Sequence, residues 1–144
     1  MDQLTKQTQL LIDFKSALER LREVLAAEPT EFNQDASIQR FEFTFELSWK
    51  LMKSLVEFKG KSCASPRDCI RLAADMEIVN DPESWIAFLN DRNALSHTYK
   101  QEFAKQVYSR LKKFLPLADQ LVSSSETIVS NEKSISSQNP KILI

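Results

Sequence analysis

The sequence is poor in glycine, which removes several fold classes. It has 1 Gly in 144 residues, where an average usage of about 7% would give roughly 10. Glycine supplies hairpin turns and barrel corners in sheet-rich folds, and close backbone approach in phosphate-binding loops. With Gly60 alone, the GxGxxG and GxxxxGK[ST] loops are impossible and a β-sandwich or barrel is disfavoured. A bundle of helices is the fold class that remains.

Cysteine and histidine are also scarce, and long apolar runs are absent. Cys63 and Cys69 form neither a CxxC pair nor a zinc quartet. No secretory signal precedes them, so we expect reduced thiols, a cytoplasmic protein and no metal site or cofactor. No apolar run approaches the ~20 residues of a membrane span. The single histidine, His97, excludes a pair of catalytic histidines within one chain.

The residues that are present fit a soluble bundle with a real core. Hydrophobic residues make up 42% of the chain and charged residues 27%, with 9 Phe and 2 Trp to fill the interior. Apolar side chains recur at helical spacing, and Pro, Gly and capping residues separate the segments. The predicted helices cover about residues 4–28, 32–59, 65–78, 82–97 and 100–122, with a kink or sharpened turn at Pro116. The sequence therefore predicts an all-α, antiparallel up-and-down bundle of four or five helices over residues 1–122.

The segment 32–59 carries two apolar stripes. Its Phe-x-Phe-x-Phe alternation also resembles a strand, but the helical spacing persists for seven turns, so length favours a helix. One stripe can face the chain's own bundle, and the other needs a partner. This second stripe consists of Phe43, Leu47, Leu51 and Phe58. It predicts a homodimer about a two-fold axis. Gly60 is expected to cap the end of this helix.

The composition changes after residue 122. Seven of the residues in 123–144 are serine, and aromatic residues are absent. Such a composition is typical of a disordered tail.

The candidate chemistry lies in the segment Asp91–Tyr99. Histidine transfers protons near neutral pH, and the arginine fork matches phosphate, so Arg92 and His97 together could cleave RNA without a metal. On an ideal helix their side chains lie about 140° apart. A helix that ends before His97, which a break at Thr98–Tyr99 would support, or a site shared by two subunits would relax this constraint. Asn93 does share a face with His97.

Two sets of charged residues allow two interpretations each. Arg40, Glu42, Glu46 and Lys50 in the second predicted helix form either a solvated strip or a polar line inside an interface. The last predicted helix is net positive, and either tracks a phosphate backbone or is a solvated face. Its basic residues are Lys100, Lys105, Arg110, Lys112 and Lys113.

Four segments together resemble a known family. They are RFEFTFELSWKLM from Arg40, SPRD from Ser65, DRNALSHTY from Asp91 and YSRLKKFLPL from Tyr108. The chain is similar over about residues 4–122 to the nucleotidyltransferase substrate-binding family of the HEPN superfamily (higher eukaryotes and prokaryotes nucleotide-binding). An R-x4-6-H pattern alone is weakly specific. The form R-x4-H-x-Y behind an aromatic-rich helix is more specific.

The resemblance implies a helical homodimer whose gene adjoins that of a minimal nucleotidyltransferase, with which it forms a toxin–antitoxin pair. It implies a metal-independent RNase site made by Arg92 and His97 with Asn93 as polar neighbour, and AMP transfer by the partner to Tyr99. AMP would add bulk and negative charge beside this site and repel RNA. Because the chain has no glycine loop, the partner has to perform the transfer.

Two other functions stay open. The chain could be a non-catalytic, substrate-binding subunit of a nucleotidyltransferase complex. It could also be a homodimeric helical adaptor without chemistry of its own.

Overall fold

The computed structural model describes residues 3–97 and 100–138, and these residues form a bundle of helices. The helices are α1 (Gln3–Ala26), α2 (Glu31–Phe58), α3 (Pro66–Asp75), α4 (Pro82–His97), α5 (Gln101–Arg110) and α6 (Phe114–Gln138). A 3-10 turn at Leu111–Lys113 joins α5 to α6. The described part of the chain contains no strand, so the predicted all-α fold is confirmed.

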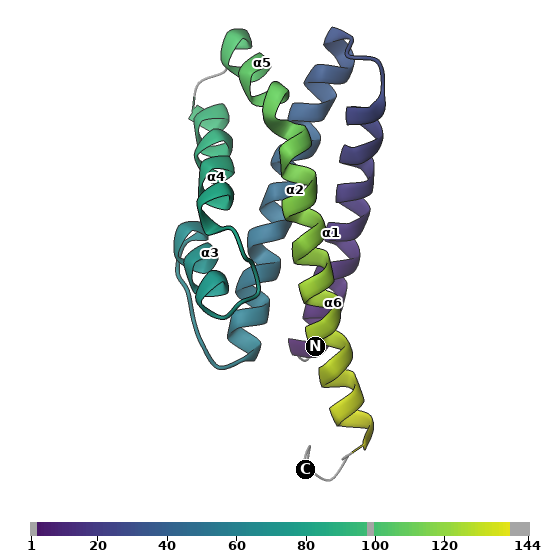
Figure 1. The fold of residues 1–144 in the computed structure, drawn as a ribbon, viewed down its shortest axis with the longest axis vertical. Helices are drawn as coiled ribbons and strands as arrows, with labels where there is room; N and C mark the ends of the chain where they lie inside the picture. Colours follow the sequence, from purple (N-terminus) through teal and green to yellow (C-terminus); the bar gives the residue numbers. More distant parts are fainter. Residues whose placement is uncertain (1–2, 98–99, 139–144) are drawn as a thin grey trace.

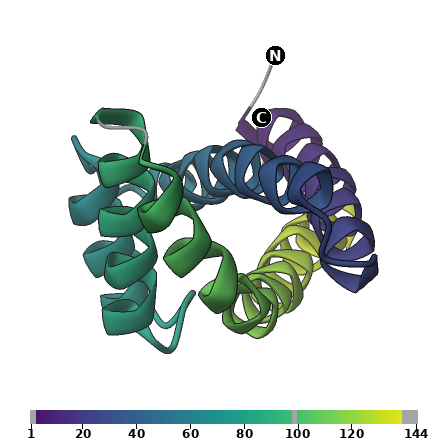
Figure 2. The same ribbon diagram turned by 90° about the horizontal axis from the view of Figure 1, so that it is seen from above.

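The long helices run antiparallel. In Figure 1, α1 rises from the N-terminal end, α2 returns beside it, α4 rises again and α5 with α6 descends. Figure 2 shows α3 and α4 together on one side of α2, and α1 and α6 on the other. Helix α2 contacts every other helix. It is therefore the central element of the bundle.

Aromatic side chains fill the core at the centre of α2. Phe41 and Phe45 each lie against Phe114 of α6, with ring centroids 5.3 and 6.2 Å apart. Trp85 and Phe88 of α4 contact the same ring at 5.5 and 5.3 Å. Such tilted and edge-to-face pairs add to the burial of large apolar areas. They fix α4, which carries the candidate chemistry, against α2 and α6.

The helix boundaries follow from capping residues. The Ser65 hydroxyl accepts the N–H of Asp68 at 3.2 Å, and Pro66 takes the first position of α3, as predicted. Asp81 accepts the N–H of Ser84 at 3.1 Å at the start of α4. Gly60 has φ +86° directly after α2. The N–H of Gly60 donates to Glu57 and that of Lys61 to Val56, which is a Schellman motif.

Two features of the C-terminal half differ from the sequence prediction. The predicted helix 100–122 is interrupted at Leu111–Lys113, because Pro116 has no N–H to donate to the preceding turn. Helix α6 continues to Gln138, so residues 123–138 are helical where the serine content predicts disorder. Ser125 and Val129 are buried, because they face the bundle on the same stripe as Leu121. In the described residues no helix combines the length and apolarity needed to span a membrane.

The prediction of two reduced thiols is also wrong. Cys63 and Cys69 form a disulfide, with Cα atoms 5.1 Å apart. The start of α3 at Pro66 turns the chain back on itself, which brings the two residues into the range of a disulfide.

The predicted second stripe of α2 is only partly exposed. Phe43 is 63% exposed, but Leu51 is fully buried and Phe58 is partly buried. The prediction fails for Leu51 because helices of the same chain cover α2 on more than one side. Of the four residues of the predicted stripe, Phe43 is exposed and Leu47 and Phe58 are partly buried.

Candidate functional site

Arg92 of α4 lies against Glu46 of α2. The Nη2 atom of Arg92 donates to Oε2 of Glu46 at 2.6 Å. The side chain of Arg92 is 28% exposed and that of Glu46 is 30% exposed. Nη1 of Arg92 contacts Oδ1 of Asn93 at 3.5 Å. Charge-assisted hydrogen bonds between half-buried groups are stronger than those on an open surface. The ion pair therefore fixes the guanidinium on the α2 side of α4.

Glu46 is the centre of a small polar cluster. Its Oε2 atom also accepts from the indole Nε1 of Trp49 at 3.1 Å, and Nζ of Lys50 lies 3.5 Å from Oε1. The structure thus brings together Glu46, Lys50, Arg92 and Asn93. Glu46 is therefore not part of a solvated strip, which was one of the two interpretations. Both oxygens of its carboxylate have partners on neighbouring side chains.

Glu42 joins this cluster one turn before Glu46. Burial raises the pKa of the Glu42 carboxyl, and the charge of Arg92 opposes the rise. Arg92 therefore faces two carboxyl groups of α2. The spacing of four residues between Glu42 and Glu46 predicts that they lie on the same face of the helix. It does not show which charged residues of that face are buried.

His97 is the last residue of α4, and it is exposed. In the part of the chain that the structure describes, the side-chain hydrogen bonds of Arg92 reach Glu46 and Asn93, and none joins it to His97. Helix α4 covers the predicted range 82–97. Because it includes His97, the earlier helix end that would let Arg92 and His97 share a face is not found. Tyr99, the predicted site of AMP transfer, lies outside the described residues.

Asp91 and Arg92 are neighbours in sequence but bind different helices. Asp91 accepts from Arg110 of α5 through both oxygens, at 2.8 and 3.2 Å. This bidentate pair ties α4 to α5, whereas Arg92 ties α4 to α2. It also engages one member of the basic run, while Lys105, Lys112 and Lys113 stay exposed.

Arg40 lies apart from the cluster. Its Nη1 atom donates to the backbone carbonyl of Arg20 on α1 at 2.8 Å. Arg40 lines a groove of about 590 Å³ between α1 and α2, together with Arg20, Phe43 and Leu47. The four charged residues predicted for a single polar line are therefore divided, with Arg40 on the α1 side of α2 and Glu42, Glu46 and Lys50 in or beside the Arg92 cluster.

The comparisons with known proteins identify relatives. The model of a family described as "Nucleotidyltransferase substrate binding protein like" matches residues 9–127. A protein of Haemophilus influenzae named "Probable ribonuclease HepT" is 36% identical over 84 residues, which is 55% of this chain. The match spans 58% of that relative's length.

Two solved structures share the fold. A crystal structure of a Thermus thermophilus protein superposes with a TM-score of 0.72 and 32% identity, and covers 78% of this chain and 98% of the other. A Haemophilus influenzae structure has a TM-score of 0.60 and 26% identity, and covers 85% of this chain and 98% of the other. That structure is described as the fold of a substrate-binding domain of a nucleotidyltransferase.

Proposed function

The chain belongs to the nucleotidyltransferase substrate-binding family, and from this membership we propose that it is the HEPN toxin subunit of a toxin–antitoxin pair. In this proposal it cleaves RNA without a metal, and a minimal nucleotidyltransferase encoded by an adjacent gene silences it by AMP transfer to Tyr99. The name of the Haemophilus influenzae relative supports the ribonuclease activity. The observation that carries the proposal is the fixed guanidinium of Arg92, on the same helix as an exposed histidine.

His97 and Arg92 have different roles in the proposed cleavage of RNA. His97 accepts the proton of a ribose 2′-OH, and the 2′-oxygen attacks the adjacent phosphorus. Arg92 binds the phosphate and its developing charge, and Glu46 and Asn93 hold Arg92 in place. The bond to the 5′-oxygen breaks, and this leaving group takes a proton from a second, protonated histidine. The products are a 2′,3′-cyclic phosphate and a 5′-hydroxyl.

The second histidine is that of a second copy of the chain. Within one chain, Arg92 and His97 are about 7.5 Å apart along the axis of α4 and face different directions. Phe43, 63% exposed, lies one turn from Glu46 on α2. A two-fold contact centred on Phe43 would place the Arg92–Glu46 pairs of both copies beside the interface. The homodimer would then form two composite sites.

RNA cleavage by the purified chain tests the catalytic roles. With EDTA present and no partner, we expect the wild type to cleave single-stranded RNA, and His97→Ala and Arg92→Ala to lose activity by about a hundredfold or more. Glu83→Ala is the matched control, because Glu83 is exposed in the first turn of the same helix. Equal cleavage by all four proteins would contradict the assignment.

Mass spectrometry after co-expression with the adjacent gene tests the modification. Each AMP adds about 329 Da, as expected for covalent nucleotidylation. We expect Tyr99→Phe to abolish the added mass, and Tyr108→Phe, which alters the only other tyrosine, to retain it. Added mass on Tyr99→Phe would reject Tyr99 as the acceptor.

A second candidate is a non-catalytic subunit that binds substrate for the nucleotidyltransferase. The charge of Arg92 is already engaged by Glu46, which favours a structural role for this residue. This candidate predicts a stable complex with the partner and no RNA cleavage by this chain in any condition.

A further inference from the structure

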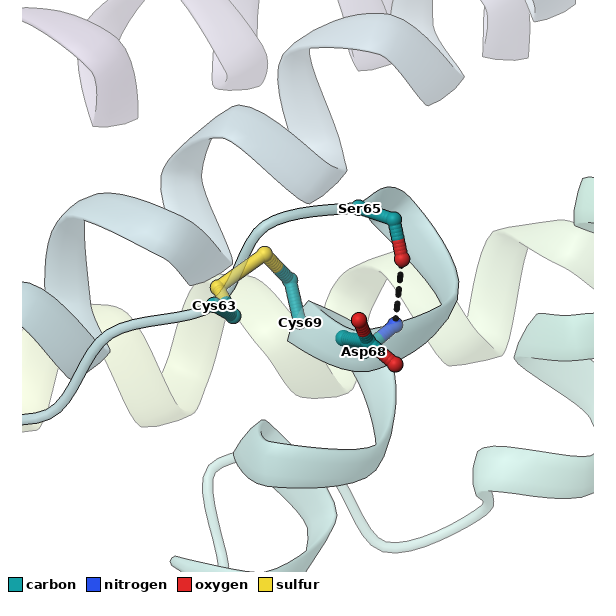
Figure 3. The surroundings of a disulfide bond; sticks show 4 residues. All are labelled: Cys63, Ser65, Asp68 and Cys69. Atoms are coloured by element: carbon teal, nitrogen blue, oxygen red, sulfur yellow. Dashed lines mark hydrogen bonds between the residues drawn. A yellow bond between two sulfur atoms is a disulfide. The ribbon is translucent and has the colours of Figure 1, made fainter.

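The disulfide crosses the first turn of α3 (Figure 3). Cys63 lies in the loop before the helix, and Cys69 is the fourth residue of α3. Between them, the Ser65 hydroxyl caps the N–H of Asp68. The two cysteines therefore bracket the helix cap, and their sulfur–sulfur bond covalently fixes the path by which the chain enters α3.

The two sulfur atoms differ in access. Cys69 is fully buried, whereas Cys63 is partly exposed. Cys63 lines a shallow hollow on the surface with Ser62, Asp68, Arg71 and Asp75. Cys63 is therefore the residue of the pair that is open to a reagent in solution, whereas Cys69 is closed to it.

The two cysteines also differ in their place on the helix. Cys69 lies in the first turn of α3, where its own N–H donates to the carbonyl of Ser65 at 2.9 Å and its side chain is fully buried. Attack on the partly exposed Cys63 with departure of Cys69 is then the direction that access favours.

From these observations we infer that Cys63 and Cys69 are a reversible thiol–disulfide exchange site for small disulfides of the glutathione class. In the oxidation, the Cys63 thiolate attacks a disulfide RSSR and forms Cys63–S–SR, releasing one RS⁻. The Cys69 thiolate then attacks the Cys63 sulfur and releases the second. The protein loses two electrons and two protons to RSSR, which becomes two RSH.

The surrounding structure allows this cycle without unfolding. The Schellman motif at Gly60 and the Ser65 cap fix both ends of the loop by hydrogen bonds that do not involve sulfur. After reduction these bonds keep the two thiols close to each other. The site is independent of the proposed RNase function, because neither cysteine belongs to the Arg92 cluster.

The experiment uses the full chain in mixtures of oxidised and reduced glutathione, followed by alkylation and intact mass measurement. We expect the protein to shift reversibly between two alkylated thiols and none as the ratio changes. Trypsin cuts after Lys61, Arg67 and Arg71, so non-reducing digestion of the oxidised form links the peptides 62–67 and 68–71. A pair that stays oxidised in excess reduced glutathione, or stays reduced in excess oxidised glutathione, would overturn the inference.

Single variants test the order of the two steps. Cys69→Ala, which leaves Cys63 as the only thiol, is expected to trap the glutathione adduct at least tenfold faster than Cys63→Ala. Circular dichroism checks that both variants are helical, and the wild-type titration does not depend on either. Equal rates in two helical variants would reject Cys63 as the attacking residue.

Discussion

The side chains around Arg92 determine what its guanidinium group can bind. Arginine is charged at every relevant pH, so its use depends on where the guanidinium is held and on what competes for it. Here Glu46 binds it at 2.6 Å, and Glu42 lies close enough for the two charges to interact. In the proposed reaction, an incoming phosphate would meet a cation that is held in place but partly neutralised by carboxyl groups.

Glu42 gives this cluster a pH dependence. Its pKa is raised above the ordinary value of 4.5, chiefly by burial, with Arg92 acting in the opposite direction. The folded state thus holds the proton more tightly than the unfolded state does. The resulting stability is fully present below the unfolded pKa and is lost as the pH rises through the folded pKa.

Replacing Glu42 by Gln removes this titration. We expect Glu42→Gln to raise Tm slightly at pH 7 and to leave it unchanged in acid below the ordinary pKa of glutamate. Thermal unfolding followed by circular dichroism across this range measures the difference from the wild type. Glu102→Gln, an exposed position on α5, is the matched control. A Glu42→Gln variant that is less stable than wild type at neutral pH would contradict the burial penalty.

The sequence predicts candidate site residues, but it does not predict what their side chains contact. The apolar spacing of residues 82–97 predicts one helix for Arg92 and His97, and α4 contains both. The contact with Glu46 spans 46 residues and depends on how α4 packs on α2. Spacing within one helix carries no information about such a contact, so it groups Arg40 with Glu46 although the two bind different helices.

At the scale of the helices, capping residues made the boundaries predictable. Ser65–Pro66 and Asp81–Pro82 start α3 and α4 as expected, because they act through local hydrogen bonds. The end of α6 depends on tertiary contacts instead. Burial of Val129 extends a helix whose serine-rich sequence has little preference for it.

The ends of α2 and α3 form a natural pair for a test. Both helices end in Schellman motifs, with Gly60 at φ +86° after α2 and Glu77 at φ 62° after α3. Only glycine adopts this left-handed conformation without steric cost, and no atom lies within 4 Å of a Cβ at position 60. The backbone alone therefore decides the effect of a substitution there.

We expect Gly60→Ala to lower the free energy of unfolding by about 1 kcal/mol, and Glu77→Gly to raise it by up to about 1 kcal/mol. Urea unfolding measures both changes. Gly60→Asn serves as control, because asparagine tolerates the left-handed region better than alanine and is expected to lose less. If Gly60→Ala raised the free energy of unfolding and Glu77→Gly lowered it, side-chain contacts would matter more at these positions than the backbone conformation.

Helix α6 allows a direct test of where the folded unit ends. Val129 is 6% exposed, and Ser130 beside it is exposed. Val129→Ala removes buried methyl groups and is expected to cost about 1–2 kcal/mol, whereas Ser130→Ala leaves stability unchanged. Urea unfolding distinguishes the two outcomes. Equal stability of both variants would mean that residues beyond 122 contribute nothing to the fold.

At the scale of the whole molecule, the free face of α2 is the feature that a single chain does not explain. Phe43 is 63% exposed and Phe32 87% exposed, and about 100° of rotation per residue places them on one face of the helix. The groove between α1 and α2 runs beside Phe43. Exposed aromatic residues beside a groove are typical of a surface that binds another protein. A second copy of the chain is the occupant that the proposed composite site requires.

A charge at the centre of this face tests the dimer. Phe43→Glu is expected to fold, because the native side chain is largely in solvent, and to turn the proposed dimer into a monomer. Light scattering coupled to size-exclusion chromatography measures the mass, and circular dichroism checks the helix content. Gln106→Glu is the control, since it adds the same charge at an exposed position on α5. If the dimer is unchanged in Phe43→Glu, the two-fold axis lies on another face, and His97 of the second copy would not reach Arg92 by this route. If wild type is itself a monomer, the composite site is wrong and any cleavage depends on one chain alone.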